Sequence, residues 1–147
     1  MTNNSDINLI WDTYLHTVTD SSLYDYCSQN TSVALDILSK FDQSYPPSIN
    51  VGPGWIPIIF SLHNKILSLV NDYKIYQIKE KFGGLRFYAY PIVLDAASDQ
   101  NKFHINQIYN HLVQVAEKQS FLTCELCANP GKFVQKNRYR TLCDNCS

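Results

Sequence analysis

The sequence has few charged residues, and its positive and negative charges nearly cancel. Charged residues make up 17% of its 147 residues, against roughly 25% in typical soluble domains, and the formal net charge is -1. A strongly basic nucleic-acid-binding protein is therefore not expected, although a local basic patch is compatible with these numbers. Disorder of the whole chain is excluded, because disordered chains are poor in aromatic residues and this chain has ten tyrosines and seven phenylalanines.

The sequence also lacks a long apolar segment and a basic leader. Its most apolar window, Trp55 to Leu62, is far shorter than the roughly 20 residues that cross a bilayer. Residues Met1 to Asp6 carry no positive charge and no apolar stretch follows them, so we expect no signal peptide. We therefore expect a cytoplasmic protein that does not enter membranes and whose thiols stay reduced.

Signatures of common enzyme classes are missing as well. The sequence contains no GxSxG, HExxH, P-loop or dinucleotide-binding pattern. Its four histidines (His16, His63, His104 and His111) are scattered. Each is expected to be a surface residue or a core residue whose hydrogen bonds are satisfied.

The spacing of apolar residues predicts an α+β fold. Helical spacing dominates residues 1–45, and a loop rich in proline and glycine separates them from Pro57, which suits the first turn of a central helix. Residues 74–82 and 85–94 have the character of two strands, and helical spacing returns at 101–119. We expect helices packed on a central β-hairpin, in an N-terminal helical region (1–45), an α+β core (53–120) and a C-terminal zinc ribbon (121–147).

Two CxxC pairs provide the strongest chemical signal. Cys124 and Cys127 are separated from Cys143 and Cys146 by 15 residues, which matches the zinc-ribbon pattern. Four thiolates fill the tetrahedral coordination sphere of zinc, so a structural Zn²⁺ is favoured over a catalytic one. A disulfide pair and a redox or iron–sulfur role are the alternatives. The fifth cysteine, Cys27, is expected to be a buried, inert thiol.

The dipeptide Gly83–Gly84 predicts a two-residue hairpin turn. Counting from this turn, Lys81 would face Arg86, and Glu80 would lie on an apolar face that also carries Tyr76 and Phe82. A bulge or an odd-length loop would break this pattern. A buried Glu80 would act either as a structural tether, to amides near Gly54–Trp55 or to an arginine of the tail, or as a general acid or base.

The opposite face of the hairpin combines cations with tyrosines and is the candidate binding surface. It would carry Lys79, Lys81, Arg86, Tyr88 and Tyr90. Three interpretations are open: a solvated surface, a contact with an acidic protein, and a contact with a phosphate-bearing ligand. In the last case bases would stack on the two tyrosines, and cations of the tail would extend the patch.

Several segments together resemble a family of small proteins encoded by phages and bacterial prophages. They are Pro53-Gly54-Trp55, the run KEKFGGLRFY from Lys79 to Tyr88, and the two cysteine pairs with their Pro130-Gly131 and Thr141-Leu142 neighbours. The resemblance covers residues 53–147. It implies a mobile-element setting, in which inhibition of a host defence or takeover of a host protein are reasonable roles, and it implies no particular reaction.

These observations favour a zinc-stabilised, non-enzymatic binding protein that engages a host or phage protein in the host cytoplasm. The first alternative is a nucleic-acid-binding zinc-ribbon protein. The second is an enzyme centred on Glu80 with Arg86 or His63. A deep, solvent-open pocket at Glu80 would favour the enzyme, and a Glu80 held by backbone amides would count against it.

Overall fold

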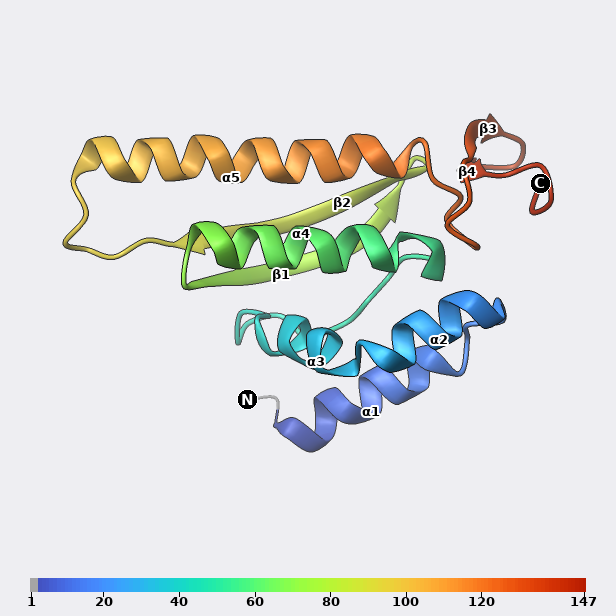
Figure 1. Cartoon of the computed structure of the whole chain (residues 1–147), viewed down its shortest axis with the longest axis horizontal. Helices are drawn as coiled ribbons and strands as arrows, with labels where there is room; N and C mark the ends of the chain where they lie inside the picture. Colours follow the sequence, from blue (N-terminus) through green and yellow to red (C-terminus); the bar gives the residue numbers. More distant parts are fainter. Residues whose placement is uncertain (1–2) are drawn as a thin grey trace.

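The structure, a computed structural model, describes residues 3–147, so Met1 and Thr2 of the predicted N-terminal region lie outside the described residues. It confirms the predicted α+β class (Figure 1). None of the helices within 3–147 has the length and apolar character needed to cross a bilayer. The elements are α1 (Asn4–Leu15), α2 (Ser21–Gln29), α3 (Thr31–Ser39), the short 3-10 helix η1 (Pro53–Trp55), α4 (Ile56–Leu69), β1 (Asp72–Lys81), β2 (Gly84–Ile92), α5 (Asp99–Ser120), β3 (Lys132–Gln135) and β4 (Tyr139–Leu142).

Three short helices form the N-terminal part of the fold. α1 begins at a capping box, in which the side chains of Asn3 and Asp6 each accept a hydrogen bond from the other residue's backbone N–H. α2 begins where Asp20 accepts a hydrogen bond from the Leu23 N–H. Trp11 of α1 is fully buried, so this part of the chain packs into the core and does not stand apart from it.

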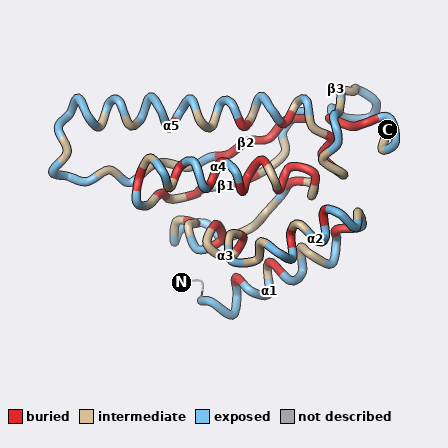
Figure 2. The backbone as a smooth tube through the Cα atoms, viewed as in Figure 1, coloured by how far each residue is buried: buried red, intermediate tan, exposed pale blue. Residues whose placement is uncertain are grey.

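The helix α4 lies at the centre of the core. Half of its 14 residues are buried. Buried segments gather in α4 and in the neighbouring strands, whereas α5 is exposed along most of its length (Figure 2). One continuous cluster of buried side chains runs from Ile7 in α1 to Ala116 in α5. The predicted regions 1–45 and 53–120 therefore share one hydrophobic core.

Both outer edges of the β1–β2 hairpin are covered by other parts of the chain. Residues 40–50 run along β1 and exchange backbone hydrogen bonds with it. On the other edge, Ser120 Oγ accepts from the Leu85 N–H and Glu117 Oε2 accepts from the Phe87 N–H, both at 2.9 Å. Because unpaired strand edges promote aggregation, the side chains of α5 protect β2.

The hairpin turn lies one position earlier than predicted. Phe82 and Gly83 form it, with φ angles of 54° and 84°, and the predicted Gly83–Gly84 turn is wrong. An ideal Cβ at Gly84 would lie only 2.2 Å from the Phe121 ring. Gly84 is therefore needed for close packing, which leaves the turn to the two residues before it.

The shifted turn changes the cross-strand partners but preserves the two faces near the turn. The predicted pair of Lys81 with Arg86 is wrong, because Lys79 takes that place. A β-bulge between Ile75 and Gln77 moves Tyr76 away from the apolar face where it was predicted, and its side chain is exposed. The observed pairs next to the turn are Lys81–Gly84, Glu80–Leu85, Lys79–Arg86 and Ile78–Phe87.

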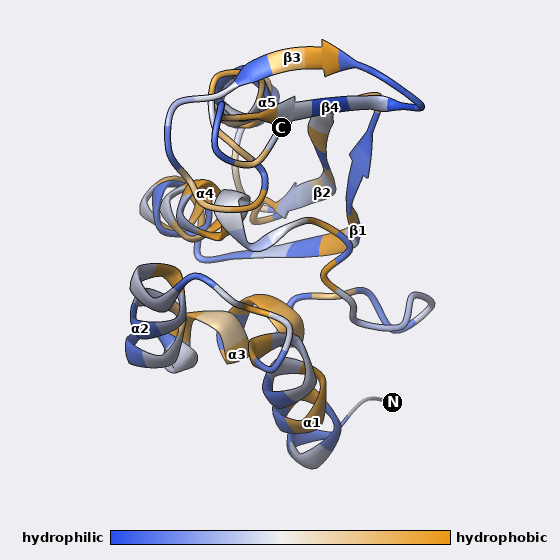
Figure 3. Ribbon diagram, turned by 90° about the vertical axis from the view of Figure 1, so that its right-hand side faces the viewer, coloured by the Kyte–Doolittle hydropathy of each residue, from blue (hydrophilic) through white to orange (hydrophobic). Residues whose placement is uncertain are grey.

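Residues 121–147 form a small C-terminal lobe around the β3–β4 pair. In Figure 3, which looks at the molecule from this end, the lobe lies above the β1–β2 hairpin and helices α1–α3 lie on the opposite side. Its own buried apolar cluster is small and consists of Cys124, Leu142 and Cys143. The lobe thus has little apolar surface with which to hold its fold.

Candidate metal centre and binding surface

The four predicted cysteine ligands lie together in the C-terminal lobe. The sulfur atoms of Cys124, Cys127, Cys143 and Cys146 are all within 4.8 Å of one another. A tetrahedral zinc ion with Zn–S bonds of about 2.3 Å would hold its sulfurs about 3.8 Å apart. The Sγ atoms of Cys127 and Cys143 are 3.5 Å apart. The cluster can therefore hold one metal ion.

Each CxxC pair occupies a tight backbone turn. In the first pair, the Ala128 N–H donates to the Cys124 carbonyl at 3.1 Å, and Ala128 has a φ of 68°. In the second, the Cys146 N–H donates to the Cys143 carbonyl at 3.2 Å. Such turns direct both sulfurs of a pair toward one point, which explains why the spacing of two intervening residues is needed.

The cysteine side chains of the cluster shift one another's pKa values. Burial raises the pKa of the Cys124 thiol, but hydrogen bonds from the backbone of Cys143, Leu126 and Cys127 outweigh burial and lower the pKa to about 7. The pKa of the Cys146 thiol is raised to about 12, first because of its hydrogen bond with the Cys143 side chain. Four thiolates this close would repel one another, and the charge of Cys124 adds to the effect of the hydrogen bonds in raising the pKa of Cys146. A divalent ion between the four sulfurs would remove the repulsion.

The first cysteine turn docks on the short helix η1. The Gly54 N–H donates to the Glu125 carbonyl at 2.8 Å, and Trp55 Nε1 donates to the Thr123 carbonyl at 2.9 Å. An ideal Cβ at Gly54 would lie 2.0 Å from the carbonyl oxygen of Cys124, so only glycine fits there. The backbone of Cys124, the first residue of the cysteine cluster, thus rests directly on the core.

The rest of the lobe docks on the hairpin turn. Thr141 is buried; its Oγ1 donates to the Gly83 carbonyl at 2.7 Å, and its own carbonyl accepts from the Glu125 N–H at 3.0 Å. The buried carboxylate of Glu125 forms an ion pair with Arg140. The segments Pro53–Trp55, Lys79–Tyr88 and the two cysteine pairs are far apart in the sequence, and they meet at this junction.

The structure brings together three of the five predicted surface residues. Lys79 pairs with Arg86 across the hairpin, and Lys79 Nζ lies 5.7 Å from the centroid of the Tyr88 ring. Lys81 is exposed next to the turn, where its Nζ lies 5.6 Å from the centroid of the Phe82 ring, whereas Tyr90 is half-buried and lies farther along β2. A like-charge pair is therefore present, but between different residues than expected.

Glu80 is half-buried and its carboxylate accepts a hydrogen bond from the Gly83 N–H at 2.8 Å. The partners that were expected for it, the amides near Gly54 and an arginine of the tail, contact Glu125 instead. Glu80 does not line any of five surface hollows of about 190 to 300 Å³ that lie on the described residues.

Sequence reasoning missed an exposed group of rings where the lobe meets the hairpin. We call Phe82, Phe133 and Tyr139 the aromatic cluster; they are 62%, 49% and 37% exposed. Phe133 and Tyr139 stack with centroids 5.3 Å apart, and Phe82 meets Tyr139 edge-on at 6.2 Å. The prediction placed Phe82 on the buried face of the hairpin, so the cluster could not be anticipated from the sequence.

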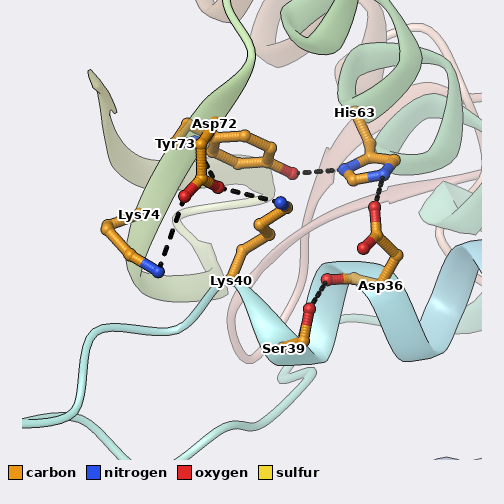
Figure 4. Close-up of polar contacts among 7 residues, drawn as sticks. All are labelled: Asp36, Ser39, Lys40, His63, Asp72, Tyr73 and Lys74. Carbon is orange, nitrogen blue, oxygen red and sulfur yellow. Dashed lines mark hydrogen bonds and ion pairs between the residues drawn. The ribbon is translucent and has the colours of Figure 1, made fainter. Parts of the chain in front are cut away.

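A polar chain ties three elements of the core together, with His63 and Tyr73 buried and Asp36 reaching the surface (Figure 4). His63 of α4 contacts Tyr73 Oη of β1 through Nδ1 at 2.6 Å and Asp36 Oδ2 of α3 through Nε2 at 2.8 Å. Burial lowers the pKa of His63 against the opposing effect of Asp36, so the neutral ring accepts from Tyr73 and donates to Asp36. Beside it, Lys40 and Asp72 form an ion pair at 2.8 Å. The sequence predicted a satisfied histidine but not its partners.

Comparison of the chain with protein-family models, with curated proteins and with solved structures finds no match. The role of the cysteine cluster and of the surfaces around it has to be inferred from the geometry of this chain.

Proposed function

We propose that this protein is a non-enzymatic binding module whose C-terminal lobe is stabilised by one structural zinc ion. The observation that carries the proposal is the closed cluster of four cysteine sulfurs within 4.8 Å of one another. Thiolates favour zinc over hard cations such as magnesium and calcium. Four of them leave no coordination position for a catalytic water, so the ion supports the architecture of the lobe.

The position of Glu80 supports binding over catalysis. The Glu80 carboxylate accepts a hydrogen bond from the Gly83 N–H and so helps to define the hairpin turn. The Gly83 carbonyl of the same turn accepts a hydrogen bond from Thr141 of the lobe. A general acid or base would have to reach a substrate in a hollow. The hollows described above are lined by other residues.

The contact surface of the proposed module is the hairpin face with Lys79, Lys81, Arg86 and Tyr88. Lys79 and Arg86 are paired like charges, which disfavours the hairpin, and neither forms an ion pair within residues 3–147. An acidic partner would relieve this repulsion. Because tyrosine and arginine dominate the energetics of protein interfaces, the fitting partner is a protein with an acidic surface.

The family resemblance supports a phage or prophage origin for the chain. In that setting the module works in the host cytoplasm, and its acidic partner is a host or phage protein.

The metal is tested by native mass spectrometry of the chain purified without added metal. One zinc per chain is expected. The Cys143→Ser variant should lose this zinc, whereas the control Cys27→Ser should keep it, because Cys27 is a buried residue of α2 outside the cysteine cluster. Iron and sulfide in the purified protein, or full zinc retention by Cys143→Ser, would contradict the structural zinc site.

The contact surface is tested by cross-linking to proteins of the bacterial host. Reversal of Lys79, Lys81 and Arg86 to Glu should abolish a partner's cross-link without unfolding the chain, because acidic groups would then repel acidic groups. The matched control reverses three cations outside the hairpin, Lys65, Lys102 and Lys118, and so changes the net charge equally. Equal loss in both variants would show unspecific electrostatic capture.

A further inference from the structure

The positive charge of the chain is concentrated in the hairpin and the lobe. Residues 72–92 and 121–147 each contain four Lys or Arg against two Asp or Glu and so carry +2 each. Because the whole chain carries -1, the remaining residues together carry -5. The aromatic cluster lies where these two basic segments meet.

Within the lobe, two cations of the turn that precedes Tyr139 form no ion pair among the described residues, and they line a hollow together with Val134 and Arg140. Both carboxylates of the lobe are occupied: Glu125 pairs with Arg140, and Asp144 pairs with Lys132 at 3.7 Å. The two other cations, Lys136 and Arg138, are exposed in the turn between β3 and β4 and form no ion pair among the described residues.

The rings of the aromatic cluster pack on one another and on Phe121. Phe133 stacks on Tyr139 with an interplanar angle of 19° and also contacts Phe121 at a centroid distance of 6.0 Å. Phe121 in turn lies against Gly84 of β2. Rings that support one another lose little conformational entropy when a ligand covers them. The contacts among the rings therefore hold exposed aromatic faces at the junction between lobe and hairpin.

We propose that the aromatic cluster, together with Lys136 and Arg138, is a binding site for single-stranded nucleic acid. Exposed rings beside unpaired cations are what such a ligand needs, because its bases stack on aromatic faces and its phosphates contact the cations. In a duplex the bases already stack on one another and their faces are closed to the cluster. An acidic peptide would use the cations but would gain nothing comparable from the rings.

This site adjoins the hairpin face proposed for a protein partner, and Lys81 lies at the border between the two. Lys81 Nζ lies 5.6 Å from the centroid of the Phe82 ring, so reversal of Lys81 would also change the surroundings of the aromatic cluster. A variant that reverses only Lys79 and Arg86 leaves Phe82, Phe133, Tyr139 and the β3–β4 turn unchanged and keeps Lys81 in place. The two proposals can therefore fail independently.

The test titrates the zinc-loaded full chain into a fluorescently labelled oligothymidylate of about 12 nucleotides and follows anisotropy. A duplex of the same length and polyglutamate serve as comparison ligands. The single strand should bind more tightly than both. Its log affinity should fall linearly with log salt concentration, with a slope of about -1.4 when two cations contact phosphates.

Two sets of variants separate stacking from charge. Phe133→Leu and Tyr139→Leu keep apolar side chains but lose the ring, and each should weaken binding about tenfold, whereas Phe103→Leu on the exposed side of α5 should have no effect. Lys136→Gln with Arg138→Gln alters only exposed side chains and should flatten the salt dependence.

Either of two results would overturn the proposal. One is equal affinity for oligothymidylate and polyglutamate, which would show that the rings add nothing to charge. The other is equal binding by the wild type and by both leucine variants with unchanged zinc content. Preference for the duplex would assign the surface to a different ligand.

Discussion

The two ends of the chain are attached to the core by different means. Helices α1–α3 insert buried apolar side chains, among them Trp11 and Leu38, into the same cluster as α4. The C-terminal lobe contributes no residue to that cluster and is attached by hydrogen bonds, close backbone contacts and rings at the hairpin turn. Apolar burial stabilises a segment without any cofactor, whereas a segment as short as the lobe has too little apolar burial to be stable alone and, in the function proposed above, depends on its metal. The two ends should therefore respond to different perturbations.

Metal removal should have the largest effect and should separate the two ends most clearly. Zinc binding contributes on the order of 10 kcal/mol to the folding of small all-cysteine sites. A chelator should therefore collapse the amide NMR dispersion of residues 121–147, while the signals of α1–α4 stay dispersed. If the lobe's amide signals keep their positions in the chelator, the metal does not hold the lobe. If the whole spectrum collapses, the ends are not independent.

A cavity in the N-terminal helices should give the opposite pattern. Leu38→Ala removes a side chain that is 1% exposed and should lower the free energy of unfolding by about 2–5 kcal/mol. Urea denaturation followed by helical circular dichroism measures this loss. The matched control is Leu9→Ala, whose side chain is 66% exposed and should change stability little. Zinc content should be unchanged in both, and a loss of zinc in Leu38→Ala would show that the ends are coupled.

The elements that could be predicted from the sequence have local signals. The helices follow from apolar spacing, and the metal ligands follow from the CxxC spacing, because a tight turn is enough to bring two sulfurs together. The turn position could not be predicted, because Gly83 and Gly84 both suit a hairpin turn and the choice depends on the Phe121 ring, which packs there from the end of α5. The partners of His63 were missed for the same reason, since they come from α3 and β1.

The junction of lobe and core shows why a motif can be visible while its role is not. Pro53-Gly54-Trp55 reads as a loop followed by a helix start in the sequence. Its glycine is required because a carbonyl of the first cysteine turn lies where a Cβ would be. The need for glycine is therefore a property of two segments in contact, and neither segment reveals it alone.

A methyl group added at this junction should weaken the docking of the lobe, although it neither creates a cavity nor removes a cysteine of the cluster. Gly54→Ala would place its Cβ 2.0 Å from the Cys124 carbonyl oxygen, so the backbones must separate. We expect a loss of about 1–3 kcal/mol in the docking of the lobe. Hydrogen exchange should be faster for residues 121–147, and zinc should transfer faster to a competing chelator. The control Ser61→Ala, exposed on α4, should behave as the wild type, and an unperturbed Gly54→Ala would contradict the docking geometry.

The smallest expected effect is a dependence of the core's stability on pH. It arises from His63, which is buried between α3, α4 and β1. Burial lowers the pKa of His63 below its ordinary value of about 6.5, so the unfolded chain takes up a proton before the folded chain does. The neutral His63 ring therefore contributes fully to the free energy of unfolding when the pH is above about 6.5. This contribution is lost as the pH falls through the lowered pKa of the folded chain. Urea denaturation between about pH 7.5 and 5.5 measures the loss, with chelator in every sample so that metal release does not contribute.

The His63→Gln variant, compared with His111→Gln on the exposed side of α5, isolates this effect. The His111→Gln chain should lose stability with acid as the wild type does, because it keeps the chain from Tyr73 through His63 to Asp36. The His63→Gln chain should be less stable at neutral pH, since a partner of Tyr73 is altered, but its stability should depend less on pH. If both variants keep the wild-type pH dependence, the acid sensitivity of the core arises from groups other than His63.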